Sequence, residues 1–199
     1  GMGFHVAVGD VDGDGYDDIV ATGPYIDQLV VNGYEGMALL WRGTSFGLSP
    51  NFTKITLPTT LSAFGTTFGR QVAIGHFMSS PRYVPPAVPG TNPPQYSPTN
   101  LPLGPSDVAF SVVSLNATAP GVPQFPSTQS GVVIIQGQST PPYMKVNASG
   151  IATSYTLLVP PQCNFSIVTA GWGFGDQACG TNPNSLISMD LNQDGYDDI

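Results

Sequence analysis

The stretch "VGDVDGDGYDDIV", residues 8–20, returns as "MDLNQDGYDDI" at residues 189–199. Counted from the first aspartate that opens each acidic loop, side-chain oxygens fall at positions 1, 3, 5 and 9, with glycine at position 6 and tyrosine at position 7. The first copy supplies Asp10, Asp12, Asp14, Tyr16 and Asp18, and the second supplies Asp190, Asn192, Asp194, Tyr196 and Asp198. One chain therefore carries the same concentrated set of oxygen donors twice.

This spacing indicates a calcium-binding loop. Alternate positions let a short loop curl so that its odd-numbered oxygens converge, and the glycine permits the tight turn. Several hard oxygens around a small cavity are what Ca²⁺ requires, and without a cation the carboxylates would repel one another. Position 12 is Ala21, where an EF-hand needs an acid, and the loop offers no His or Cys to zinc. We expect two Ca²⁺ sites; a solvated acidic turn is the alternative.

The charge of the chain is concentrated in these two loops. The 199 residues include thirteen acids and five bases, and nine of the acids lie in the two motifs. The remaining surface is close to neutral, so no basic stripe exists to follow a nucleic-acid backbone. No apolar run approaches the roughly 18 residues of a membrane span. We expect no nucleic-acid partner and no membrane span in this segment.

Short strands joined by turns are expected throughout, because glycine (24) and proline (20) are both abundant. Eight apolar or alternating runs fall into two sets of four in the same order. They are residues 4–9, 18–22, 36–43 and 52–58, then residues 70–77, 107–114, 131–137 and 154–160. Four strands in up-and-down order indicate the blade of a β-propeller. The predicted fold is therefore all-β, with blades of four antiparallel strands.

Three units are expected: residues 1–67, residues 68–171 and the start of a third at 172–199. The second unit has "GHF" at residues 75–77 where the first has its acidic loop, followed by a Pro-rich insert at 78–105. We expect no calcium there, and an extended insert that acts as a spacer, or alternatively as a binding or O-glycosylated loop. Two units and a start cannot close a ring, so the chain is expected to be part of a longer polypeptide or assembly.

These motifs together resemble the FG-GAP repeat. The pattern "FG-x-x-VA-x-G" stands at residues 68–75, and the acidic loop at 10–18 is followed by an apolar strand and "GP". The resemblance implies the β-propeller of integrin α-subunit heads and of related extracellular proteins. It also implies that the ten residues named above are the calcium ligands, the two tyrosines through their backbone carbonyls. In that family the ions stabilise the hairpin at a blade edge, and recognition uses loops on another face.

An extracellular location is expected from the polar composition. Asn-x-Ser/Thr sequons, which can accept a glycan, occur at Asn51, Asn116, Asn147 and Asn164. In an oxidising compartment Cys163 and Cys179 could form a disulfide, and two free buried thiols are the alternative. The expected product is a secreted or cell-surface glycoprotein.

No enzyme is expected. Neither His5 nor His76 lies in a catalytic motif, and nothing in the spacing brings Glu35 and Asp107 together. Trp41 and Trp172 are expected to pack between blades. Turn and insert tyrosines could contact a sugar or peptide: Tyr25, Tyr34, Tyr83 and Tyr96.

The sequence thus supports three hypotheses for function. The first is an extracellular, calcium-stabilised FG-GAP β-propeller segment that serves in adhesion by binding a protein or glycan. The second is a structural subunit of an extracellular glycoprotein filament or sheath, whose partners are copies of itself. The third is an accessory domain of a secreted hydrolase.

Overall fold

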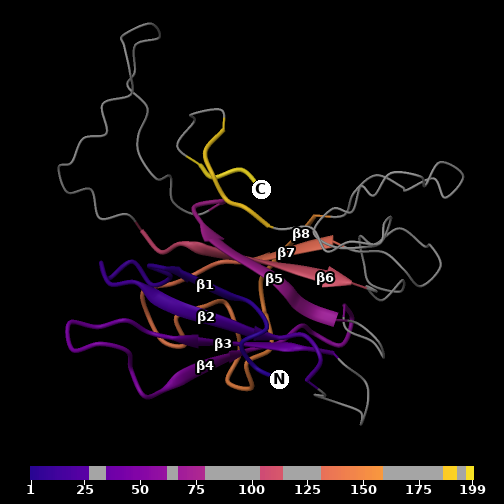
Figure 1. Cartoon of the computed structure of the whole chain (residues 1–199), viewed down its shortest axis with the longest axis horizontal. Coiled ribbons are helices and arrows are strands. Elements are labelled where there is room, and N and C mark those ends of the chain that lie inside the picture. The colour runs from indigo at the N-terminus through magenta and orange to yellow at the C-terminus, as the bar shows by residue number, and fades with distance from the viewer. Residues whose placement is uncertain (27–34, 62–66, 79–103, 114–130, 159–185, 192–195) are drawn as a thin grey trace, which may run out of the picture.

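Eight strands build the part of the chain that the computed structural model describes, which is residues 1–26, 35–61, 67–78, 104–113, 131–158, 186–191 and 196–199. They form two four-stranded antiparallel sheets, and the described residues contain no helix (Figure 1). The first sheet holds β1 (Val6–Gly9), β2 (Asp18–Gly23), β3 (Met37–Trp41) and β4 (Phe52–Ile55). The second holds β5 (Thr67–Gly75), β6 (Asp107–Val113), β7 (Gly131–Ile135) and β8 (Thr156–Leu158). All eight overlap the predicted runs, which confirms the all-β fold of four-stranded units.

The two sheets repeat one another position by position. Neighbouring strands follow chain order in both. Gly9 pairs with Asp18 in the first sheet as Gly75 pairs with Asp107 in the second. The equivalence continues across the sheets, because the partner of Ile19 is Trp41 and the partner of Val108 is Ile135. The described sheets are therefore two copies of one β-propeller-like blade, and they do not form a closed ring.

The main hydrophobic core lies between the sheets, which stack face to face (Figure 1). Phe68 and Phe110 are fully buried there, with ring centroids 4.7 Å apart. Because side chains alternate along a strand, every second residue faces this core. The other strand residues in the core are Val20, Ala38, Leu40 and Ile55 from the first sheet and Val72, Val108, Val112, Val133 and Ile135 from the second.

Two glycines allow β5 to approach the first sheet closely. Gly36 and Gly69 have φ values of +75° and +84°, a region that L side chains rarely adopt. A Cβ on Gly36 would lie 2.4 Å from the backbone oxygen of Phe68, and one on Gly69 would lie 3.0 Å from Cβ of Thr22. In the Phe-Gly pair of the predicted motif, Phe68 thus places its ring in the core, and Gly69, which has no side chain, lets β5 approach Thr22 of the first sheet.

The connection between β7 and β8, residues 136–155, folds back onto the first sheet. The backbone N–H of Thr56 donates to the carbonyl of Gly150 at 2.8 Å, and the N–H of Ala152 donates to the carbonyl of Thr56 at 2.9 Å. Met144 is fully buried in the shared core. This connection therefore ties the second blade to the end of β4.

Residues 186–188 contact the second sheet from the side opposite the first sheet. Leu186 packs against Ala109, Val132 and Ile134 on that face. The hydroxyl of Ser188 donates to the backbone carbonyl of Ile74 at 2.9 Å. The second sheet thus has contacts on both of its faces.

Several predictions concern residues outside the described part of the chain and stay predictions. These residues are Tyr34, Tyr83, Tyr96, Asn116, Cys163, Asn164, Trp172, Cys179, Asn192, Asp194 and all of the insert except its ends. Among the described residues, no helix is long and apolar enough to cross a bilayer.

Candidate metal centre

Asp10 organises the first acidic loop, which joins β1 to β2. Its Oδ1 accepts the backbone N–H groups of Gly13 at 2.7 Å and Asp14 at 3.1 Å, and its Oδ2 accepts that of Gly15 at 2.8 Å. Gly13 and Gly15 have φ values of 76° and 90°, which glycine adopts without strain. The loop is therefore wound around the carboxylate of Asp10, as its spacing predicts.

Asp18 closes the loop from the first residue of β2 and is fully buried. Its Oδ2 accepts the N–H of Val11 at 2.8 Å, and its Oδ1 accepts the N–H of Gly43 at 2.7 Å. Burial raises the pKa of Asp18 to about 6, and the two N–H donors offset only part of that effect. A nearby positive charge would favour the ionised carboxylate.

Three carboxylates converge at this point. Asp10, Asp12 and Asp18 each place an oxygen within 4.8 Å of the other two. Asp12, like Asp18, is buried, and burial raises its pKa even though Arg42 acts in the opposite direction. Converging carboxylates, two of them buried, form a donor set that suits a hard divalent cation. The three aspartates therefore fit Ca²⁺.

The fifth and seventh positions are arranged differently. Asp14 is exposed and lies outside the converging trio. Its Oδ1 accepts the N–H of Tyr16 at 3.0 Å, and its Oδ2 accepts a hydrogen bond from Nη2 of Arg42 at 2.5 Å. Arg42 also donates through Nε to Oδ2 of Asp12. The sequence analysis did not identify Arg42, which lies inside the predicted run at residues 36–43 and has no local pattern that links it to the loop.

The second acidic loop repeats the closing geometry of the first. Asp198 pairs with Met189 in an antiparallel bridge, and its Oδ2 accepts the N–H of Leu191 at 2.9 Å, as Oδ2 of Asp18 accepts that of Val11. Asp190 and Tyr196 belong to the described residues, and residues 192–195 between them do not. The base of the loop is therefore built alike in both copies.

Residues 2–40 match the family model of the FG-GAP repeat. This part of the chain is similar to an FG-GAP repeat. The match covers β1, the first acidic loop, β2 and most of β3. A search of curated proteins found no match.

The FG-GAP loop has a counterpart in the second blade that the sequence reasoning did not recognise. Asp107 begins β6 as Asp18 begins β2, it is fully buried, and its Oδ2 accepts the N–H of Met78 at 2.7 Å. In all three places the aspartate carboxylate accepts an N–H from the segment after the preceding strand: Val11 for Asp18, Met78 for Asp107 and Leu191 for Asp198. The signal in the sequence was an aspartate at the start of the second apolar run in both sets, Asp18 and Asp107. The second blade therefore has this hydrogen bond although it lacks the acidic loop.

Asp197, one residue before the last ligand position, links the second FG-GAP-like loop to the second blade. It is buried, its Oδ2 accepts the N–H of His76 at 2.8 Å, and its own N–H donates to the carbonyl of His76 at 2.9 Å. His76 follows Gly75, so it occupies the position that Asp10 holds in the first blade. The sequence reasoning missed Asp197, and no short-range pattern marks it.

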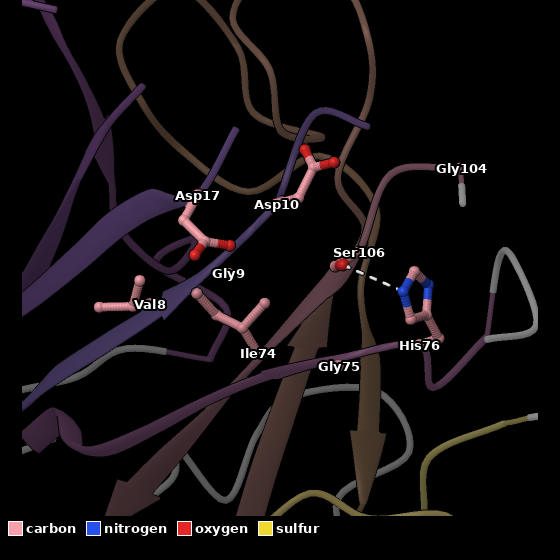
Figure 2. Close-up of a pocket in the computed structure, with 9 residues that line it drawn as sticks. All are labelled: Val8, Gly9, Asp10, Asp17, Ile74, Gly75, His76, Gly104 and Ser106. Carbon is pink, nitrogen blue, oxygen red and sulfur yellow. Dashed lines mark hydrogen bonds between the residues drawn. The ribbon is translucent and has the colours of Figure 1, made fainter. Parts of the chain in front are cut away.

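A pocket of about 360 Å³ lies beside the first loop, between the two blades (Figure 2). Asp10 and Asp17 lie on its first-blade side, and His76 and Ser106 lie on the other, with Oγ of Ser106 3.4 Å from Nε2 of His76. Val8 and Ile74 give it an apolar part. The candidate ion site is therefore next to a polar opening.

Other predicted sites are placed as follows. Asn51 and Asn147 are exposed. Tyr25 is also exposed and makes an edge-to-face contact with Phe4 at 5.6 Å. Trp41 does not face the second blade, so its predicted packing between blades stays a prediction that concerns a further blade. It alternates with the core residues of β3 and so lies half-buried on the outer face of the first sheet.

Proposed function

We propose that this chain is a segment of an extracellular, calcium-stabilised FG-GAP β-propeller that serves in adhesion by binding a protein or glycan ligand. The observation that carries the proposal is the convergence of Asp10, Asp12 and Asp18 in the loop of the matched repeat. Four sequons support the extracellular location. The proposal assigns the segment no catalytic activity.

In this proposal the residues of each loop hold one calcium ion. The first set is Asp10, Asp12, Asp14, the carbonyl of Tyr16 and Asp18, and the second is Asp190, Asn192, Asp194, the carbonyl of Tyr196 and Asp198. When bound, the ion supplies the positive charge that lets buried carboxylates stay ionised. Asp18 connects the loop to the segment after β3, because it binds the N–H of Gly43. The ion therefore stabilises a corner where three strands meet.

Calcium removal should lower the melting temperature. An ion present at about 100 times its Kd adds about 2.7 kcal/mol to the free energy of unfolding. Two ions therefore give about 5 kcal/mol, which corresponds to roughly 10–20 °C for a chain of this length. Calorimetry in 1 mM Ca²⁺ and in a chelator would measure the shift, with Mg²⁺ as a control that should restore much less. Identical curves in calcium and chelator would rule out calcium stabilisation.

The outer face of the first sheet supports the view that another blade covers it. Val6 and Val8 correspond by register to Val72 and Ile74, which pack against the first sheet. Val72 is 2% exposed, whereas Val6 and Val8 are 49% and 59% exposed. The same face carries Ile19, Leu39, Trp41 and Phe52. Its shape and chemistry suit a sheet like the second one.

This open face also favours the second candidate, a subunit of an extracellular filament or sheath. In that case a copy of the chain covers Val6 and Val8, and further copies add in line. Sedimentation over a range of concentrations separates the candidates. Concentration-dependent assembly that Val8→Lys abolishes would favour the filament, whereas a monomer at all concentrations would favour the adhesion segment.

A further inference from the structure

Arg42 lies where the first acidic loop, the end of β3 and the second blade meet. Its guanidinium binds Oδ2 of Asp12 through Nε and Oδ2 of Asp14 through Nη2. On its other side, Nη1 donates to the hydroxyl of Tyr143 at 3.3 Å, and Cζ lies 4.2 Å from the centre of the Tyr143 ring. Residues of both blades therefore contact the guanidinium of Arg42.

The two carboxylates that bind Arg42 are the third and fifth positions of the loop. Oδ1 of Asp12 already accepts the N–H of Asp14, and Oδ1 of Asp14 accepts the N–H of Tyr16. Both Oδ2 atoms are directed to the guanidinium instead. A divalent ion at the converging carboxylates and the guanidinium that is bound to Asp12 would repel one another at short range.

Asp14 is the residue through which this competition acts most directly. Asp10, Asp12 and Asp18 already converge without it. Asp14 is held by Arg42, and its side chain is 30% exposed, so it has room to turn. Completion of the calcium site therefore requires Asp14 to leave Arg42.

We propose that Arg42 is the built-in counter-cation of the first loop. It holds Asp12 and Asp14 while no ion is bound, and it competes with calcium for them. The inference rests on the proposed calcium site and adds a determinant of its affinity. Because Tyr143 belongs to the connection between β7 and β8, loss of the Asp14 contact also changes how the first loop is held against the second blade.

Calorimetric titration of the full chain with CaCl₂ tests this competition. In Arg42→Gln we expect one of the two dissociation constants to fall about tenfold, which corresponds to about 1.4 kcal/mol, and the other to stay unchanged. In chelator the same variant should melt below the parent, because the acids of the loop have lost their counter-charge. Arg42→Lys should bind calcium with intermediate affinity, because lysine keeps the charge but lacks the planar fork.

Lys145→Gln is the matched control, because Lys145 is exposed and the substitution removes the same charge. It should leave both dissociation constants at the parent values. Equal or weaker calcium binding by Arg42→Gln, with binding by the parent intact, would overturn the role of Arg42 and leave the calcium proposal standing. Absence of binding by the parent would overturn both. If Arg42→Gln does not fold, Arg42→Lys decides in the same way, with tighter binding as support and equal or weaker binding as refutation.

Discussion

Replacing Phe110 by alanine is expected to lower the free energy of unfolding by about 4 kcal/mol. The ring is fully buried between the sheets and contacts the ring of Phe68, with centroids 4.7 Å apart. Truncation removes apolar area from the core and leaves a cavity that two rigid sheets cannot close. Urea unfolding in saturating calcium would measure the loss.

Phe46→Ala is the matched control for this substitution. Phe46 is 99% exposed in the turn between β3 and β4, so its removal should change the free energy of unfolding by less than about 0.5 kcal/mol. A loss below about 1 kcal/mol in Phe110→Ala would mean that the two blades do not share one core.

Replacing Asp18 by alanine is expected to cost about 3 kcal/mol and to remove one calcium ion. Both carboxylate oxygens accept buried N–H groups, from Val11 and Gly43, and the variant would leave these donors without their partner. Each buried donor left unsatisfied costs about 1–3 kcal/mol. Unfolding in chelator measures this structural part, and the added stabilisation by calcium measures the loss of the ion.

Asp107→Ala separates the structural role of the aspartate at the start of a blade's second strand from its proposed role as a calcium ligand. Asp107 makes the corresponding contact, to the N–H of Met78, in the blade that lacks the acidic loop. Its replacement should also destabilise the chain, but it should leave calcium binding unchanged. Full calcium binding by Asp18→Ala, or loss of an ion in Asp107→Ala, would place the first ion elsewhere.

The strands could be predicted from the sequence because each is a short apolar run between turn residues, and because the runs occur twice in the same order. The core face of a strand such as β3 follows from alternation, as Ala38 and Leu40 show. The side of the sheet on which a neighbouring blade lies does not follow from alternation. For this reason the sequence did not show that Trp41 lies on the face of the first sheet that points away from the second blade.

The loops could be predicted in part for a related reason. The spacing from Asp10 to Asp18 is local, so it predicted the winding of the loop and the convergence of three carboxylates. The contacts of Arg42 could not be predicted, because strand register brings it to the loop from a distant position in the sequence. Asp14 shows the limit most clearly, since its position in the motif marks it as a ligand while Arg42 holds it in the structure.

Calcium content after equilibrium dialysis tests the central claim most directly. We expect two ions per chain in the parent, one in Asp10→Ala and one in Asp190→Ala, because each variant loses the first ligand of one loop. Elemental analysis of dialysed protein gives the stoichiometry without reference to stability. A parent that retains no calcium, or two variants that both retain two ions, would contradict the assignment of the acidic loops as calcium sites.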